Sequence, residues 1–213
     1  MTIGIPPQVL QEIENLKKEG NYDDAIKLVN GILSRDPNNE DALLQIADLQ
    51  YQKWEIEKAD KAVTFLNAKK KDDPLTLYIK GILEMEKNNR EVAKKSLKQA
   101  LDLTNGENHE IIRCYGLCEY RYGNREKGVE WLKKSFKINN QDAEVIYNLI
   151  QLYMLESDYD NANKMIDYFY EHHDHLILVD KELKWYDRKI ALFVKAIENK
   201  IKNKSQKKKL LSK

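Results

Sequence analysis

Three histidines and two carboxylates stand together in the C-terminal part of this sequence. The run Glu171-His172-His173-Asp174-His175 contains only side-chain types that zinc accepts as ligands. Neighbouring residues on a helix point about 100° apart, so one ion could bind several of them only on an irregular backbone. A solvated helix end is the alternative interpretation, because the helix dipole favours a protonated imidazole there. The sequence leaves both interpretations open, and we assign no metal site.

Two cysteines, Cys114 and Cys118, lie one helical turn apart in an apolar stretch. Two cysteines cannot build a disulfide scaffold, and their setting is typical of small buried thiols in an intracellular protein. The N-terminal residues show no basic segment followed by an apolar one, and no run of about 18 apolar residues occurs. We therefore expect a cytoplasmic protein without a membrane span.

The sequence contains no recognisable motif of catalysis or nucleotide binding. The patterns G-x-x-x-x-G-K-[ST], G-x-G-x-x-G, H-E-x-x-H and G-x-S-x-G are all absent. Nucleotide-binding, zinc-protease and hydrolase mechanisms therefore lack the residues that they need. We expect a protein that is not an enzyme and that uses no cofactor.

Charge is distributed unevenly along the chain. The 36 basic and 35 acidic residues nearly balance, yet residues 200–213 contain seven lysines and no acid, so residues 1–199 carry 29 − 35 = −6. We expect residues 204–213 to form a solvated, disordered basic tail. Weak attachment of this tail to nucleic acid or to an anionic membrane is the alternative. We expect no nucleic-acid binding by the rest of the chain.

The helices that must position any site follow a repeating pattern. A small residue recurs within an apolar helical pattern at spacings of 34, 34, 35 and 34 residues. Two further apolar series recur in step with it, which chance does not explain. The small residues are Ala25, Ala59, Ala93, Gly128 and Ala162.

Each repeating unit divides into two amphipathic helices of about 14 residues, separated by turn-forming residues such as Gly20-Asn21. With 8 glycines and 4 prolines in 213 residues, the chain has too few turn formers for an all-β fold. The predicted helices are 6–19 and 22–34, 40–53 and 56–69, 74–87 and 90–103, 109–122 and 125–138, and 143–156 and 159–172.

The first of the five repeats contains Gly20-Asn21-Tyr22-Asp23-Asp24-Ala25-Ile26, and the fifth repeat contains Asp158-Tyr159-Asp160-Asn161-Ala162. These residues resemble the tetratricopeptide repeat, a unit of 34 residues that forms a helix, a turn and a second helix. The resemblance covers residues 6–175. The sequence departs from the family pattern where Trp54 replaces the turn glycine. It also departs where a tyrosine is replaced by Gln50, Glu84 and Glu119.

The resemblance implies an all-α fold, a right-handed superhelical α-solenoid whose neighbouring repeats stack to bury their apolar faces. After the fifth unit, apolar residues at helical spacing predict a helix that caps the last repeat. The predicted organisation is an N-terminal extension (1–5), five repeats spanning 6–175 (6–39, 40–73, 74–108, 109–142 and 143–175), a capping helix (176–203) and the basic tail (204–213).

In the family, ligands contact a concave wall that the first helices of successive repeats form. The residues at the ligand-facing positions of this chain are apolar and rich in tyrosine, as expected of an interaction surface. We expect Tyr78, Tyr120 and Tyr147 to form one ladder along this wall. The implied peptide-binding residues are Leu44, Asp48, Tyr51, Leu75, Tyr78, Ile82, Met85, Arg113, Leu117, Tyr120, Tyr147, Gln151, Met154 and Leu155.

These features predict a non-enzymatic protein–protein interaction scaffold that binds a peptide or an amphipathic helix in its concave groove. The family's clamp for a C-terminal carboxylate is disfavoured, because its positions hold Leu10, Glu14 and Asp48. Further acids around the wall, such as Glu86, favour a protein or peptide ligand with apolar and basic residues. A chaperone that shields an aggregation-prone partner is one alternative. A self-assembling oligomer is another, with residues 1–7 or the terminal helix of one copy in the groove of the next.

Overall fold

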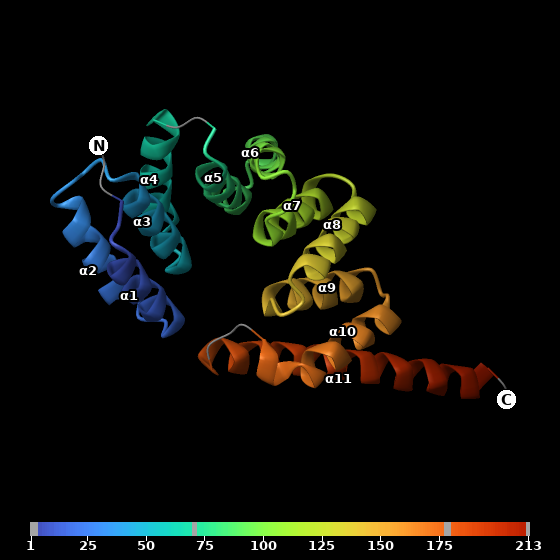
Figure 1. Cartoon of the computed structure of the whole chain (residues 1–213). Coiled ribbons are helices and arrows are strands. Elements are labelled where there is room, and N and C mark those ends of the chain that lie inside the picture. Colours follow the sequence, from blue (N-terminus) through green and yellow to red (C-terminus); the bar gives the residue numbers. More distant parts are fainter. Residues whose placement is uncertain (1–3, 70–71, 177–179, 212–213) are drawn as a thin grey trace. The chain divides into compact units, whose positions relative to one another are not determined.

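The computed structural model of the protein describes residues 4–69, 72–176 and 180–211. These residues form α-helices and a short 3₁₀ helix at His173–His175, and they contain no strand (Figure 1). The all-α fold class that the sequence predicts is confirmed. The α-helices are α1 (Pro7–Lys18), α2 (Tyr22–Leu33), α3 (Glu40–Gln52), α4 (Ile56–Lys69), α5 (Pro74–Glu86), α6 (Arg90–Leu103), α7 (His109–Tyr122), α8 (Arg125–Ile138), α9 (Ala143–Leu155), α10 (Tyr159–Glu171) and α11 (Asp180–Leu211).

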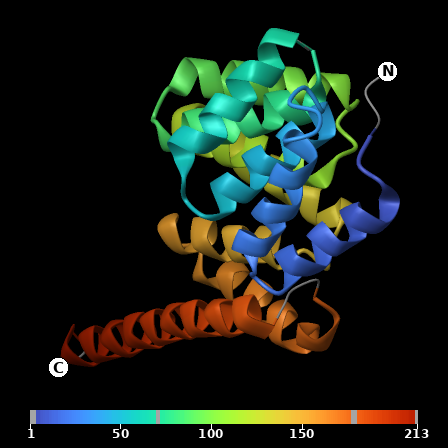
Figure 2. The same ribbon diagram turned by 90° about the vertical axis from the view of Figure 1, so that its left-hand side faces the viewer.

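The chain divides into two compact units, Met1–Trp131 and Leu132–Lys213. In the first unit, α1 packs on α2, α3 on α4 and α5 on α6, and each of these second helices also contacts the next first helix. In the second unit, α9 packs on α10, and α11 contacts both. Figure 2 shows α11, in red, extending well beyond these two helices. The order of contacts is that of consecutive helix pairs followed by a C-terminal helix.

Asparagine or aspartate side chains begin the first helices of the later pairs. Asn39 Oδ1 accepts a hydrogen bond from the backbone N–H three residues on, at 3.0 Å. Asp73 accepts the equivalent hydrogen bond at 2.7 Å, and Asn108 and Asp142 cap α7 and α9. These oxygens pair with backbone donors that a helix leaves unpaired at its start. The turn residues of the sequence therefore set where the first helices begin.

The recurring small residues lie in the interior, between the helices of a pair. Ala25, Ala59 and Ala93 have no exposed surface. At Gly128, an added Cβ would lie 2.6 Å from the backbone N of Tyr120 on the preceding helix. Because α7 and α8 approach this closely, a side chain larger than hydrogen cannot be accommodated without a shift.

Four of the turns inside the helix pairs share a left-handed backbone conformation, whereas Gly123 in the turn between α7 and α8 has φ = −130°. Gly20 has φ = +69°, and Trp54, Asn88 and Ser157 have φ = +60°, +59° and +61°. Glycine adopts this region freely and asparagine tolerates it, but it costs most other residues about 1–2 kcal/mol. The replacement of the turn glycine by Trp54 therefore keeps the turn conformation and adds strain.

Helix α11 begins at Asp180 and buries Tyr186, Ile190 and Ile197. These residues belong to the apolar pattern that predicts a capping helix. The backbone stays helical as far as Leu211, past the predicted end at residue 203 and into the segment that we expected to be disordered. Residues 212–213 of that segment lie outside the described residues. Among the helices described above, none is long and apolar enough to cross a bilayer.

The start of the chain packs on its own first unit. Ile5 contacts the core cluster that contains Ile13 and Ala42. The predicted N-terminal extension is thus held in part by its own chain, and residues 1–3 lie outside the described residues.

Candidate functional site

The predicted ligand-facing residues of the first unit lie on α3, α5 and α7. Several of them keep part of their apolar surface in solvent, and Leu75 at the start of α5 is 47% exposed. The half-buried residues of this set are Leu44, Tyr51, Tyr78, Leu117 and Tyr120. We call these five residues and Leu75 the first-helix wall.

Three residues that the sequence predicts on this wall are buried instead. Ile82 and Met85 are each 7% exposed and pack in a core cluster with Leu97 and Ile111. Arg113 is 9% exposed. The resemblance places all three at ligand-facing positions, but in this chain that side of the helices includes core as well as surface. These three residues therefore offer little accessible surface to a ligand.

All three predicted ladder tyrosines contact a later helix, and Arg125 Cζ of α8 lies 5.6 Å from the centroid of the Tyr120 ring. The Cys114 Sγ of α7 lies 3.8 Å from the Tyr78 hydroxyl. In the second unit, the centroid of the Tyr147 ring lies 5.4 Å from that of Trp185 and 5.3 Å from that of Tyr186, both on α11. Burial raises the pKa of Tyr147. Tyr147 therefore packs beneath α11 and does not stand open in the predicted ladder.

The remaining predicted site residues belong to the second half of α9. Gln151 and Met154 are half-buried, and Leu155 is 68% exposed. These residues lie in the second unit, whereas the first-helix wall is a feature of the first. Their assignment to a peptide site stays a prediction.

An ion-pair cluster lies between α1 and α3. Lys17 Nζ is 2.8 Å from Asp48 Oδ2 and 3.0 Å from Glu14 Oε1. Burial lowers the pKa of Lys17, but the two carboxylates outweigh this effect and raise it. Asp48, which the sequence predicts to face a ligand, is thus already paired within the chain. Asp41 and Glu110 on the first turns of α3 and α7 are exposed.

Glu119, which the sequence shows only as a departure from the family pattern, belongs to a buried polar network. Its Oε1 accepts a hydrogen bond from the Tyr115 hydroxyl at 2.8 Å and pairs with Lys94 Nζ at 2.9 Å. Burial raises the pKa of Glu119, but these contacts and a turn N–H outweigh burial and lower it. In the preceding pair, Asn89 Nδ2 donates to Glu84 Oε2 at 2.6 Å. These carboxylates tie the first helices to their turns, so their role is structural.

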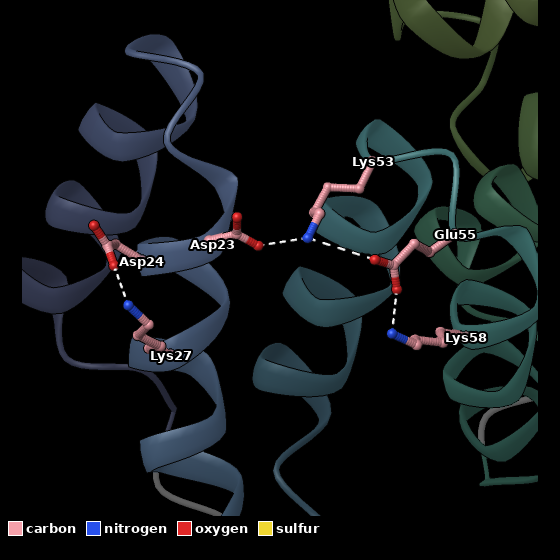
Figure 3. Close-up of polar contacts among 6 residues, drawn as sticks. All are labelled: Asp23, Asp24, Lys27, Lys53, Glu55 and Lys58. Carbon is pink, nitrogen blue, oxygen red and sulfur yellow. Dashed lines mark hydrogen bonds and ion pairs between the residues drawn. The ribbon is translucent and has the colours of Figure 1, made fainter.

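Ion pairs also join successive helix pairs. Figure 3 shows Lys53 between Asp23 of α2 and Glu55, which follows α3. Lys87, which directly follows the next first helix, pairs with Asp60 of α4 at 2.6 Å. Pairs of this partly exposed kind contribute about 0–1 kcal/mol each. They favour one register of each helix pair on the preceding one.

Trp54 lies beside the first-helix wall, in the turn between α3 and α4. Its side chain is 67% exposed. The centroids of its ring and the Tyr51 ring are 6.2 Å apart, with an interplanar angle of 70°. The sequence identifies Trp54 as a departure from the family pattern, but it does not show that the indole stands in solvent next to a wall residue.

The histidine run and the cysteines do not form a reactive site. His172 stacks on Tyr168 with ring centroids 4.0 Å apart, whereas His173 Nε2 lies 3.3 Å from Asp187. Throughout the described ranges, no three His, Cys, Asp or Glu side chains are grouped as a metal site requires. Both cysteines are buried, and burial together with Glu119 raises the pKa of the Cys118 thiol to about 11. That thiol is protonated, and so unreactive, at neutral pH.

Comparison with known sequences agrees with this arrangement. Residues 16–80 match the family model described as tetratricopeptide repeat. The TPR repeat-containing protein MJ1428 of Methanocaldococcus jannaschii is 26% identical over 148 residues, which are 68% of this chain and 25% of that protein. The chain thus spans about a quarter of the length of the curated relative that it matches.

Solved structures share the fold. TTC0263, a thermophilic TPR protein of Thermus thermophilus, matches with a TM-score of 0.71 and 20% identity, over 87% of this chain and 98% of that chain. YrrB, described as a TPR protein with an unusual peptide-binding site, matches with a TM-score of 0.53 and 15% identity, over 85% of this chain and 90% of that chain. At these identities the likeness concerns the fold alone.

Proposed function

Because this chain is a tetratricopeptide repeat protein, we propose that it acts as a protein-interaction scaffold and not as an enzyme. Its first-helix wall binds a peptide or an amphipathic helix of a partner protein. The observation that carries this proposal is the set of solvent-accessible apolar and aromatic side chains on α3, α5 and α7. Contiguous exposed apolar surface is typical of interaction sites, and tyrosine offers large, rigid contact area.

The relatives support a peptide ligand. The peptide-binding site in the description of YrrB belongs to a protein of the same fold. An array of paired helices presents a preformed surface, so a ligand is bound without the cost of ordering the scaffold. A peptide or helix that places apolar side chains on the wall is the ligand that gains most from such a surface.

The charges beside the wall indicate which residues should flank the apolar side chains of the ligand. Lys17 balances one of the two negative charges of Asp48 and Glu14, so this three-residue cluster between α1 and α3 keeps a net negative charge. Asp41 and Glu110 are exposed on the first turns of their helices. Basic residues that flank the apolar anchors of the ligand therefore complement the first unit best.

A triple variant of the wall tests the proposal. Tyr51→Ala, Leu75→Ala and Leu117→Ala together remove accessible apolar surface without altering a fully buried side chain. The full chain and the variant are used for affinity capture from source lysate, and the bound proteins are identified. We expect the variant to lose specific partners while its circular dichroism spectrum is unchanged.

The matched control lies on α6, a second helix. Val92→Ala and Leu103→Ala also remove exposed apolar surface, and this variant should capture the same partners as the unmodified chain. Loss of partners in the control, with retention in the wall variant, would place the binding surface on the second helices and refute the proposal. Light scattering over a range of concentrations separates binding of a partner from self-assembly.

A further inference from the structure

We propose that Trp54 is a recognition element at the edge of the first-helix wall, where its exposed indole binds an uncharged apolar side chain of the bound peptide. This inference rests on the proposed function. It extends the binding surface from the first helices to the turn between α3 and α4, and it specifies the chemistry of the ligand at that point.

The backbone of Trp54 is the first argument. Its φ of +60° lies in the left-handed region, where Gly20, Asn88 and Ser157 stand at equivalent turn positions. Glycine, the residue of the family pattern, would adopt this conformation without strain. Strained residues persist where their surroundings fix them, and they cluster at functional sites. The turn itself does not need a tryptophan, so the side chain requires another explanation.

The exposure of the indole is the second argument. At 67%, Trp54 is the most exposed aromatic residue in the described part of the chain. It meets the half-buried Tyr51 in an edge-to-face arrangement, and two-thirds of Trp54 stays exposed to solvent. Because Tyr51 belongs to the first-helix wall, the two rings form one aromatic surface that leads from the wall to the turn.

The residues directly before and after Trp54, Lys53 and Glu55, both form the ion pairs that Figure 3 shows. Lys53 precedes Trp54 and pairs with Asp23 of the preceding helix pair and with Glu55. Glu55 follows Trp54 and pairs with Lys58. These contacts restrict the backbone on either side of Trp54, so a ligand meets an indole whose point of attachment is held in place. Such preorganisation lowers the entropic cost of binding.

The charges around Trp54 indicate the chemistry of the ligand. The ion pairs made by the neighbours of Trp54 join Lys53 and Lys58 to Asp23 and Glu55, so two lysines balance two acids at this turn. A charged ligand side chain would lose water here without gaining a partner. A proline, aliphatic or aromatic side chain would instead cover the apolar surface of Trp54 and Tyr51, as anchors in binding hot spots do.

Peptides selected from a random library displayed on phage are the probes for the test, with the full chain as the immobilised target. The selected peptides are synthesised, and their affinities are measured for the full chain and for Trp54→Gly. Because glycine suits the left-handed conformation of this turn, we expect the Tm of this variant to be unchanged or higher. We expect its affinity for the peptides to fall at least about tenfold.

The control is Phe65→Ala on α4, which removes an exposed aromatic side chain from an ordinary helical backbone. This variant should bind the peptides as the full chain does. The loss of affinity in Trp54→Gly should also be the same at low and high salt, because the indole binds through apolar contact and carries no charge.

The possible results separate this inference from the proposed function. Full affinity in Trp54→Gly, with weakened binding in Leu117→Ala, would overturn the inference and leave the proposed function standing. A Tm several degrees lower in Trp54→Gly would assign the indole a structural role and overturn the inference as well. A library that yields no binding peptide would count against both.

Discussion

Two glycines of this chain should respond in opposite ways to an added methyl group. At Gly31 on α2, an added Cβ would meet nothing within 4 Å, whereas at Gly128 it would lie 2.6 Å from the backbone N of Tyr120. Gly31→Ala should raise the free energy of unfolding by about 0.5–1 kcal/mol, because alanine favours the helix. Gly128→Ala should lower it by about 1–3 kcal/mol, because α7 and α8 must move apart. Urea unfolding measures both changes, and two changes of the same sign would contradict the close contact at Gly128.

The carboxylate of Glu119 should make stability depend on pH. Its pKa is lowered in the folded protein, so the unfolded chain binds a proton more readily. Glu119 therefore stabilises the fold above its unfolded pKa of about 4.3, and this contribution is lost as the pH falls through the lower folded pKa. We expect Glu119→Gln to reduce the free energy of unfolding by about 1–2 kcal/mol at neutral pH and to have little effect in acid.

Urea unfolding of the two proteins across this pH range checks the prediction. Glu57→Gln, on the exposed surface of α4, is the control and should change stability little at any pH. If the free energies of unfolding of Glu119→Gln and the unmodified chain differ by the same amount at every pH, the charge of Glu119 does not contribute to the stability of the fold.

At the scale of the helix, α11 should act as a cap for the second unit. Its residues Tyr186, Ile190 and Ile197 are buried, and no described side chain beyond Ile197 is. Deletion of residues 204–213 should therefore leave the Tm nearly unchanged. Deletion of residues 180–213 should expose the surface beneath α11, including Tyr147, and lower the Tm or cause aggregation.

The measurements are thermal unfolding and the binding of a dye that reports exposed apolar surface. Lys134→Ala, on the exposed surface of α8, controls for the loss of a positive charge alone. If the two deletions behave alike, α11 does not cap the unit.

The sequence predicts the helices of this protein better than it predicts the surfaces. The apolar period predicts helices at 90–103 and 125–138, and the structure confirms both at Arg90–Leu103 and Arg125–Ile138. Such a period identifies the apolar side of a helix, because side chains three and four residues apart share a face. It does not distinguish a side chain that faces solvent from one that faces another helix. Ile82 and Tyr147 are predicted on the wall because they stand at the family's ligand-facing positions, although both pack against other side chains in this chain.

Long-range polar contacts were also beyond prediction from one sequence. Lys94 and Glu119 belong to different helices and meet because α6 packs on α7. Glu119 stands out only as a departure from the family pattern, and Lys94 does not stand out by type or spacing. The exposure of Trp54 could have been suspected, because a tryptophan at the place of a turn glycine is an unusual substitution. Its distance from Tyr51 required the structure.

For the molecule as a whole, stability should vary strongly along the chain. Helix α5 buries Leu77, Ile79 and Leu83, whereas Ile13 is the buried residue of α1. The part of α11 after Ile197 has no buried residue among its described side chains. Hydrogen exchange followed by mass spectrometry should therefore be slowest in α5 and fast both in α1 and in residues 198–211. Equal protection of α1 and α5 would show that the first unit opens only as a whole.

The ion pairs between the helix pairs bear on how this array could change during evolution. Lys53 and Lys87 reach back to Asp23 and Asp60 of the preceding helix pairs, whereas Lys94 reaches forward to Glu119. The two aspartates also differ in position, because Asp23 directly follows the first residue of α2, Tyr22, whereas Asp60 lies about one turn after the first residue of α4, Ile56. The joints between repeats are therefore not copies of one another. Duplication or loss of an internal repeat would bring together helix pairs whose charged side chains are not each other's partners. Their charges would then be left unpaired. New repeats would be tolerated best at the ends of the array, so its interior should be inherited as one block.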